Sequence, residues 1–74
     1  MHYDYSKLIG KIVEKFNTRK NFATAMNMSI TSASAKLNGK TQFRQDEIVR
    51  AVELLEIPAE EVKSYFFTLK VQNN

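Results

Sequence analysis

The chain has 74 residues, a length that is enough for one small domain with a single core. Its formal charge is +3. It has no cysteine, and this excludes a disulfide framework and a thiolate metal site. The longest apolar run is three residues, so the sequence predicts neither a membrane-spanning helix nor a signal peptide. We therefore expect a single all-α domain over residues 1–74.

The first predicted helix covers residues 5–16 and carries one apolar stripe. Its apolar residues recur at helical spacing: Tyr5, Leu8, Ile9, Ile12, Val13 and Phe16. Gly10 interrupts this helix at a cost of about 1 kcal/mol relative to alanine. We interpret that cost as a sign that a neighbouring element packs closely against Gly10.

A second helix is predicted over residues 19–26, with Thr18 as its N-cap. Phe22, Ala23 and Met26 give it one apolar face, and the small Ala23 suits a point where two helices cross. Asn27 follows where the chain must turn, because asparagine tolerates the left-handed conformation.

The third helix is predicted over residues 30–38. Ser29 is its expected N-cap, Ala33 and Leu37 are its expected inward residues, and Asn38-Gly39 ends it. Two short helices joined by a tight turn have the layout of a helix-turn-helix, which places its second helix in the DNA major groove.

Two further helices complete the predicted bundle, over residues 45–56 and 59–66. Acidic residues in their first turns suit the positive end of the helix dipole, and Pro58 separates the two helices. Residues 67–74 form a short tail, in which apolar and polar residues alternate over residues 67–71. This segment could be a strand, a dimer arm or an ordered tail.

Charge is distributed unevenly along the chain. Residues 1–45 hold eight Lys/Arg and two Asp/Glu, a formal +6, whereas residues 46–74 hold three and six, a formal −3. No acidic residue occurs between Glu14 and Asp46, although five basic residues do from Arg19 to Arg44. An acid-free segment of this kind favours contact with a polyanion such as duplex DNA, although basic residues also simply keep small domains soluble.

The segment from Thr18 to Lys40 resembles the Cro/CI family of phage repressors and related bacterial regulators. The matching motifs are Thr18, Phe22-Ala23, Met26, Asn27-Met28-Ser29 and Leu37-Asn38-Gly39-Lys40. Outside it, Tyr3-Asp4-Tyr5-Ser6-Lys7-Leu8 and Phe66-Phe67-Thr68 are similar to small Cro-like proteins of temperate phages of Gram-positive bacteria, some of which act as modulators of repression. The resemblance implies a compact five-helix, lambda-repressor-like DNA-binding domain in the cytoplasm of a bacterial host.

Two features depart from that family pattern. Asn27 stands where glycine is usual, and the recognition helix is rich in serine and alanine. The residues expected to contact DNA or a protein partner lie on the second and third helices and just after them: Arg19, Lys20, Ser29, Ile30, Thr31, Ser32, Ala35, Lys36, Asn38, Lys40 and Arg44. Of these, Arg19, Ser29, Lys40 and Arg44 are expected at phosphates, and Thr31, Ser32, Ala35 and Lys36 at base edges.

Two functions of different classes follow. The leading prediction is a Cro-like regulator of the lysis-lysogeny switch, which binds operator DNA as a homodimer through its third helix. The alternative is an antirepressor or modulator of repression, which binds a CI-type repressor protein through its second and third helices; exposed Ile30 favours this reading. An enzyme is not expected, nor is a metal or cofactor, because the single histidine lies near the N-terminus and no phosphate-binding glycine loop is present.

Overall fold

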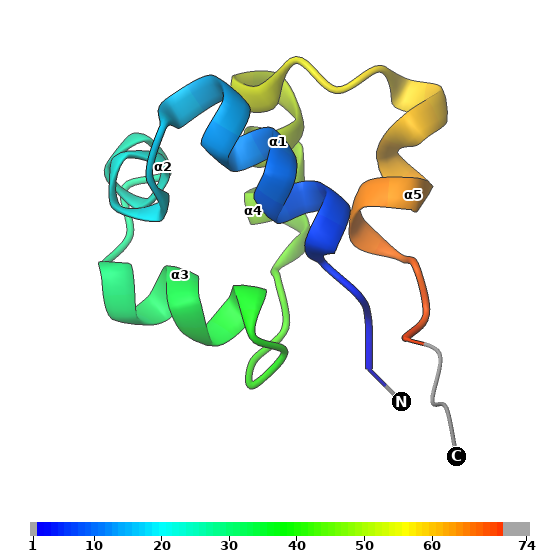
Figure 1. Cartoon of the computed structure of the whole chain (residues 1–74), viewed down its shortest axis with the longest axis horizontal. Coiled ribbons are helices and arrows are strands. Elements are labelled where there is room, and N and C mark those ends of the chain that lie inside the picture. The colour runs from blue at the N-terminus through cyan, green and yellow to red at the C-terminus, as the bar shows by residue number, and fades with distance from the viewer. Residues whose placement is uncertain (1, 71–74) are drawn as a thin grey trace.

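A computed structural model describes residues 2–70 as a bundle of five α-helices (Figure 1). They are α1 (Ser6–Phe16), α2 (Arg19–Ala25), α3 (Ile30–Leu37), α4 (Gln45–Leu55) and α5 (Val62–Phe66), with the 3₁₀-helix η1 (Ala59–Glu61) directly before α5. The predicted all-α class is confirmed. The last predicted helix differs in that its first turn is 3₁₀, which is common at helix starts. None of the helices in residues 2–70 is long and apolar enough to cross a bilayer.

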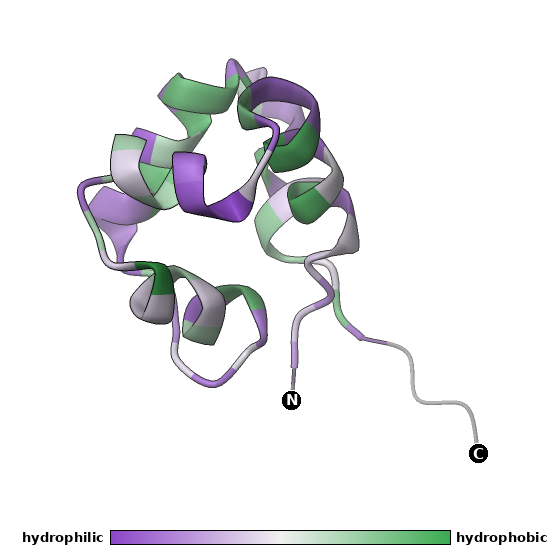
Figure 2. Cartoon of the chain, turned by 60° about the vertical axis from the view of Figure 1, so that its left-hand side comes forward, coloured by the Kyte–Doolittle hydropathy of each residue, from purple (hydrophilic) through white to green (hydrophobic). Residues whose placement is uncertain are grey.

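The core lies where α1 packs against α2, α4 and α5, and α3 packs against α2. Hydrophobic and hydrophilic residues are mixed along the helices in Figure 2, as expected when a helix buries one face. The largest fully buried side chains come from all four of α1, α2, α4 and α5: Leu8, Ile12, Phe22, Leu55 and Phe66. Val13 is the exception to the predicted stripe of α1, because it lies at the edge of that stripe and is 49% exposed.

Phe43 anchors the loop between α3 and α4 to the core. Its ring makes edge-to-face contacts with Tyr5, at a centroid distance of 5.4 Å, and with Phe66, at 5.5 Å. Such aromatic pairs stabilise by about 0.5–1.5 kcal/mol beyond the area that they bury. The loop that follows α3 is therefore tied to the first and last helices.

The predicted caps and turns around α2 and α3 are confirmed. The Thr18 side chain accepts a hydrogen bond from the backbone N–H of Asn21, and that of Ser29 accepts one from the backbone N–H of Ser32, each at 3.0 Å. Asn27 has a φ of 60° and Gly39 a φ of 80°, so both adopt the left-handed conformation. These local signals therefore fix where α2 begins and where α3 begins and ends.

The two ends of the described chain pair with each other, as the adjacent blue and orange segments in Figure 1 show. Tyr3 and Leu69 form an isolated antiparallel bridge, in which Asp4 N–H donates to the Thr68 carbonyl and Lys70 N–H donates to the His2 carbonyl. Residues 67–70 of the predicted tail therefore extend along the N-terminal segment. The rest of that tail, residues 71–74, lies outside the described residues.

Gly10 does not lie against a neighbouring element, contrary to our interpretation of the sequence. A Cβ atom built on Gly10 meets no atom within 4 Å, because this side of α1 faces solvent. We expect Gly10→Ala to raise the free energy of unfolding by about 1 kcal/mol, through the higher helix propensity of alanine. Gly39→Ala is the contrasting variant, since the left-handed conformation at Gly39 should make it destabilising. Urea melts of both variants measure this, and a Gly10→Ala protein no more stable than the parent would contradict it.

Candidate functional site

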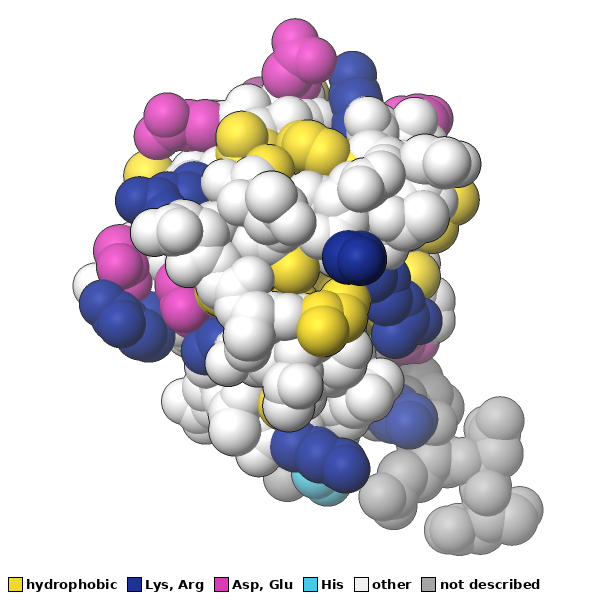
Figure 3. Space-filling view, turned by 90° about the vertical axis from the view of Figure 1, so that its left-hand side faces the viewer, with side chains coloured by type: hydrophobic (Ala, Val, Ile, Leu, Met, Phe, Trp, Pro, Cys, Tyr) yellow, Lys and Arg dark blue, Asp and Glu magenta, His cyan; other side chains and the backbone are white. Residues whose placement is uncertain are grey.

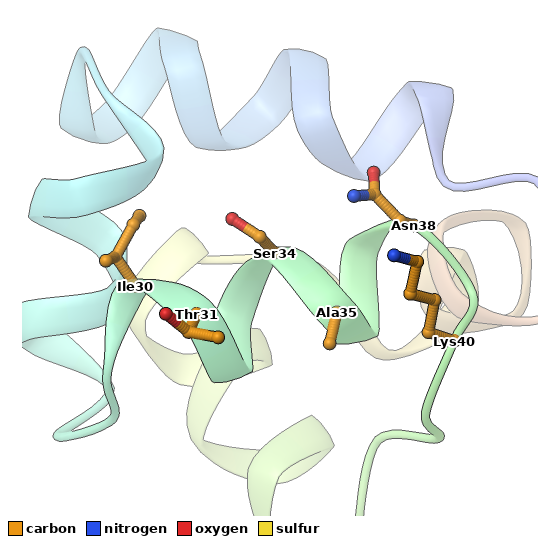
Figure 4. A pocket seen from close by; sticks show the side chains of 6 residues that line it. All are labelled: Ile30, Thr31, Ser34, Ala35, Asn38 and Lys40. Atoms are coloured by element: carbon orange, nitrogen blue, oxygen red, sulfur yellow. The ribbon is translucent and has the colours of Figure 1, made fainter.

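The outward side of α3 carries an open hollow of about 410 Å³ (Figure 4). Its lining is made almost entirely of uncharged side chains, with one lysine at the end of the helix: Ile30, Thr31, Ser34, Ala35, Asn38 and Lys40. The close-up shows the Lys40 side chain turning back toward Asn38, so the positive charge lies at the C-terminal end of α3.

Helical spacing explains which residues reach this hollow. Ile30, Ser34 and Asn38 follow one another at intervals of four residues and lie along one side of α3 in Figure 4. Ile30 is 44% exposed, because the buried positions of α3 are already filled by Ala33 and Leu37. Ser34 was absent from the predicted site, although its position four residues after Ile30 could have indicated it.

Lys36 does not face outward, contrary to the expectation that it reaches base edges. Its Nζ lies 2.9 Å from Oε1 of Glu47 and donates to the carbonyl oxygen of Gln42 at 3.2 Å. Its side chain is only 13% exposed. Lys36 therefore ties the last turn of α3 to the first turn of α4 and is removed from the surface available to a partner.

The Glu47 carboxylate is the acceptor in this contact between α3 and α4. Burial opposes ionisation of its carboxyl, but hydrogen bonds from the backbone N–H of Arg44 and from Lys36 outweigh it and lower the pKa of Glu47 below its ordinary value. A carboxyl with a lowered pKa stabilises the fold above its ordinary pKa, and this contribution is lost as the pH falls through the lowered value.

We expect Glu47→Gln to lower the free energy of unfolding at pH 7 by about 1 kcal/mol, because Lys36 loses its charged partner. The difference from the parent should shrink as the pH falls below the ordinary value of about 4.5, where the carboxyl of the unfolded chain takes up its proton, and should be lost once the pH passes through the lowered pKa of folded Glu47. Glu53→Gln is the matched control on the same helix, since Glu53 is exposed. Denaturant melts between pH 7 and pH 3 measure both variants, and an undiminished difference at pH 3 would show that the ionised carboxylate is not responsible.

The other predicted contact residues fall into two groups. The first group already has partners within the chain: Arg44 pairs with Asp46, and the hydroxyl of Ser29 caps α3. Ser32, next to that cap, is exposed. By contrast, within residues 2–70 no ion pair is formed by the three remaining basic residues of this region, Arg19, Lys20 and Lys40. Figure 3 shows that uncharged side chains cover most of the face formed by α2 and the start of α3.

Arg50 is a further residue of this region that the sequence pattern did not indicate. Its Nη1 donates to the carbonyl oxygen of Met26 at 3.0 Å, at the C-terminal end of α2. Cations are favourable at helix C-termini, where carbonyl oxygens lack partners. Arg50 therefore holds the turn between α2 and α3 against α4. Among residues 2–70, no group of three or more His, Cys, Asp or Glu could hold a metal ion.

A solved structure of a phage protein is similar to this chain over nearly its whole length. The chain is similar to the modulator of repression of the temperate bacteriophage TP901-1 from Lactococcus lactis, as determined in solution, with 49% sequence identity and a TM-score of 0.80. The similarity covers 97% of each chain. No curated protein matches the chain.

The comparisons confirm the phage-regulator part of the predicted resemblance. The relative is a phage modulator of repression, as the resemblance implied. Membership in the Cro/CI family is a finer statement, which rests on the sequence motifs alone. A family model described as a protein of unknown function, DUF739, matches residues 1–69, and the chain therefore belongs to the DUF739 family.

Proposed function

We propose that this protein modulates phage repression by binding a CI-type repressor protein, and that it blocks or redirects the repressor's binding to operator DNA. The α3 surface would make the contact. This was the alternative reading of the sequence, and the similarity to a modulator of repression supports it above the Cro-like reading.

The observation that carries the proposal is the uncharged character of the α3 surface. Ile30 and Ala35 present alkyl groups there, and Lys36 is committed to Glu47. A surface that reads DNA needs cations and bidentate polar side chains, whereas a protein groove is filled by an exposed branched apolar residue. The α3 surface therefore suits a protein partner better than a phosphate-rich one.

The experiment is a gel-shift titration of the operator region with the neighbouring phage repressor, run with and without this protein. We expect this protein to release or alter the repressor–operator complex at a stoichiometric ratio and to give no defined footprint alone. A clear footprint by the protein alone, together with no complex with the repressor in size-exclusion chromatography, would overturn the proposal.

Cro-like operator binding is the second candidate, and one observation favours it. Arg19, Lys20 and Lys40 have no ion-pair partner within residues 2–70, so they are available to phosphates. Under this candidate the wild-type protein binds DNA as a homodimer spanning two half-sites. Arg19→Ala and Lys40→Ala would then each reduce the salt dependence of DNA binding by about one ion.

A further inference from the structure

The hollow on α3 does not end at the helix. It meets a second hollow of about 200 Å³ at Lys40, which lines both, and a third of about 270 Å³ at Asn38. The second and third hollows share Tyr3 and Tyr5 of the N-terminal segment. The three hollows are therefore neighbours, and we refer to them together as the groove, which reaches from Ile30 past Lys40 to the N-terminal segment.

The charges along this groove are few and mostly positive. Lys40 lines two of its hollows, and Lys70 lines the third. Asp4 is the one carboxylate in the lining, and its Oδ1 accepts a hydrogen bond from the backbone N–H of Ser6 at 2.8 Å, at the start of α1. That carboxylate is already committed to the N-terminus of α1, whereas Lys40 forms no ion pair within residues 2–70.

We propose that Lys40 selects the occupant of this groove, which is a protein segment with small apolar side chains against Ile30 and Ala35 and a carboxylate that pairs with Lys40. This inference rests on the proposed function and adds the chemistry of the partner surface. A protein segment that fills the groove excludes water from around Lys40, so an opposite charge there interacts more strongly than at an open surface.

The groove also limits what the partner surface can be. An inhibitor that imitated DNA would present carboxylates to the phosphate-binding residues of a repressor, and this groove presents lysines instead. Its occupant is therefore a neutral or acidic part of the partner protein. A phosphate backbone is the competing ligand for Lys40, and it is distinguished by the test below.

Isothermal titration of the wild-type protein and three full-length variants with the neighbouring phage repressor tests the inference. We expect Lys40→Gln to weaken binding about fivefold and Lys40→Glu by more than about tenfold. Lys63→Glu makes the same change of charge at an exposed position on α5 that lines none of the three hollows, and it should bind within about twofold of wild type. Changing each exposed Asp or Glu of the repressor to Lys in turn should identify one variant that restores binding to Lys40→Glu.

The outcomes separate this inference from the proposed function. If Lys40→Glu binds the repressor like wild type while Ile30→Ala does not, the proposed function stands and the role of Lys40 is wrong. If Lys40→Glu loses affinity for DNA but not for the repressor, Lys40 does not pair with a carboxylate of the repressor. The same follows if no charge reversal in the repressor restores binding to Lys40→Glu. If the wild-type protein does not bind the repressor at all, the proposed function and this inference both fall.

Discussion

Ile30→Ala is expected to weaken repressor binding by about 2 kcal/mol, or roughly 30-fold, while the protein remains fully folded. Ile30 is the exposed branched residue in the first turn of α3 and lines the hollow at the opposite end from Lys40. Its truncation removes an apolar group that would be buried against the partner. The fold should not suffer, because Ala33 and Leu37 hold α3 to the core and alanine is a better helix former than isoleucine.

Val49→Ala is the matched control for this prediction. Val49 is also a branched apolar residue on a helix, and it is 58% exposed, but it lies on α4 and lines none of the hollows around α3. Calorimetric titration with the repressor should distinguish Ile30→Ala from Val49→Ala, and thermal melts should show that both are as stable as the parent. Equal affinity of the two variants for the repressor would mean that α3 is not the centre of the interface.

The helices around the site could be predicted because their signals are local. Thr18 and Ser29 cap the backbone N–H groups three residues further along, and Asn27 adopts the left-handed turn in place of glycine. These interactions depend on neighbouring residues alone, so the pattern of residue types is sufficient to place α2, the turn and α3. Five helices with the expected apolar stripes follow from the same kind of information.

The features that could not be predicted depend on contacts between residues distant in the sequence. Lys36 and Glu47 lie on different helices, and only the path of the loop between them brings the two charges together. Phe43 gave no periodic signal because it belongs to that loop, although it packs between Tyr5 and Phe66. The empty space beside Gly10 likewise depends on where the other helices pass.

The choice between DNA and a protein partner shows the same limit at the level of function. Two short helices with a tight turn suit either partner, because the fold presents the outward face of α3 without deciding what that face carries. The pattern counted Lys36 as an available cation, whereas the structure buries its side chain in an ion pair with Glu47. Arg44 also pairs with Asp46, but both of these side chains stay exposed. Without Lys36, the outward side of α3 has one cation fewer for DNA than the sequence pattern suggested.

Ala23→Leu is expected to lower the free energy of unfolding by about 1–3 kcal/mol. Ala23 is 2% exposed, and its carbonyl oxygen accepts a hydrogen bond from the backbone N–H of Met28 at 3.0 Å, so the turn toward α3 lies close to it. We expect a leucine side chain at this buried position to push α2 and α3 apart. Such a movement would also change the shape of the groove, because Ile30, which lines it, is the first residue of α3.

Ala25→Leu tests whether this effect comes from packing and not from the substitution itself. Ala25 is the last residue of the same helix and is exposed, so leucine there should change stability by less than about 0.5 kcal/mol. Urea melts compare the two variants, and titration with the repressor shows whether the loss of packing at Ala23 also weakens binding. If Ala23→Leu were as stable as Ala25→Leu, then α2 and α3 would not be packed together at Ala23, and other contacts would have to position α3.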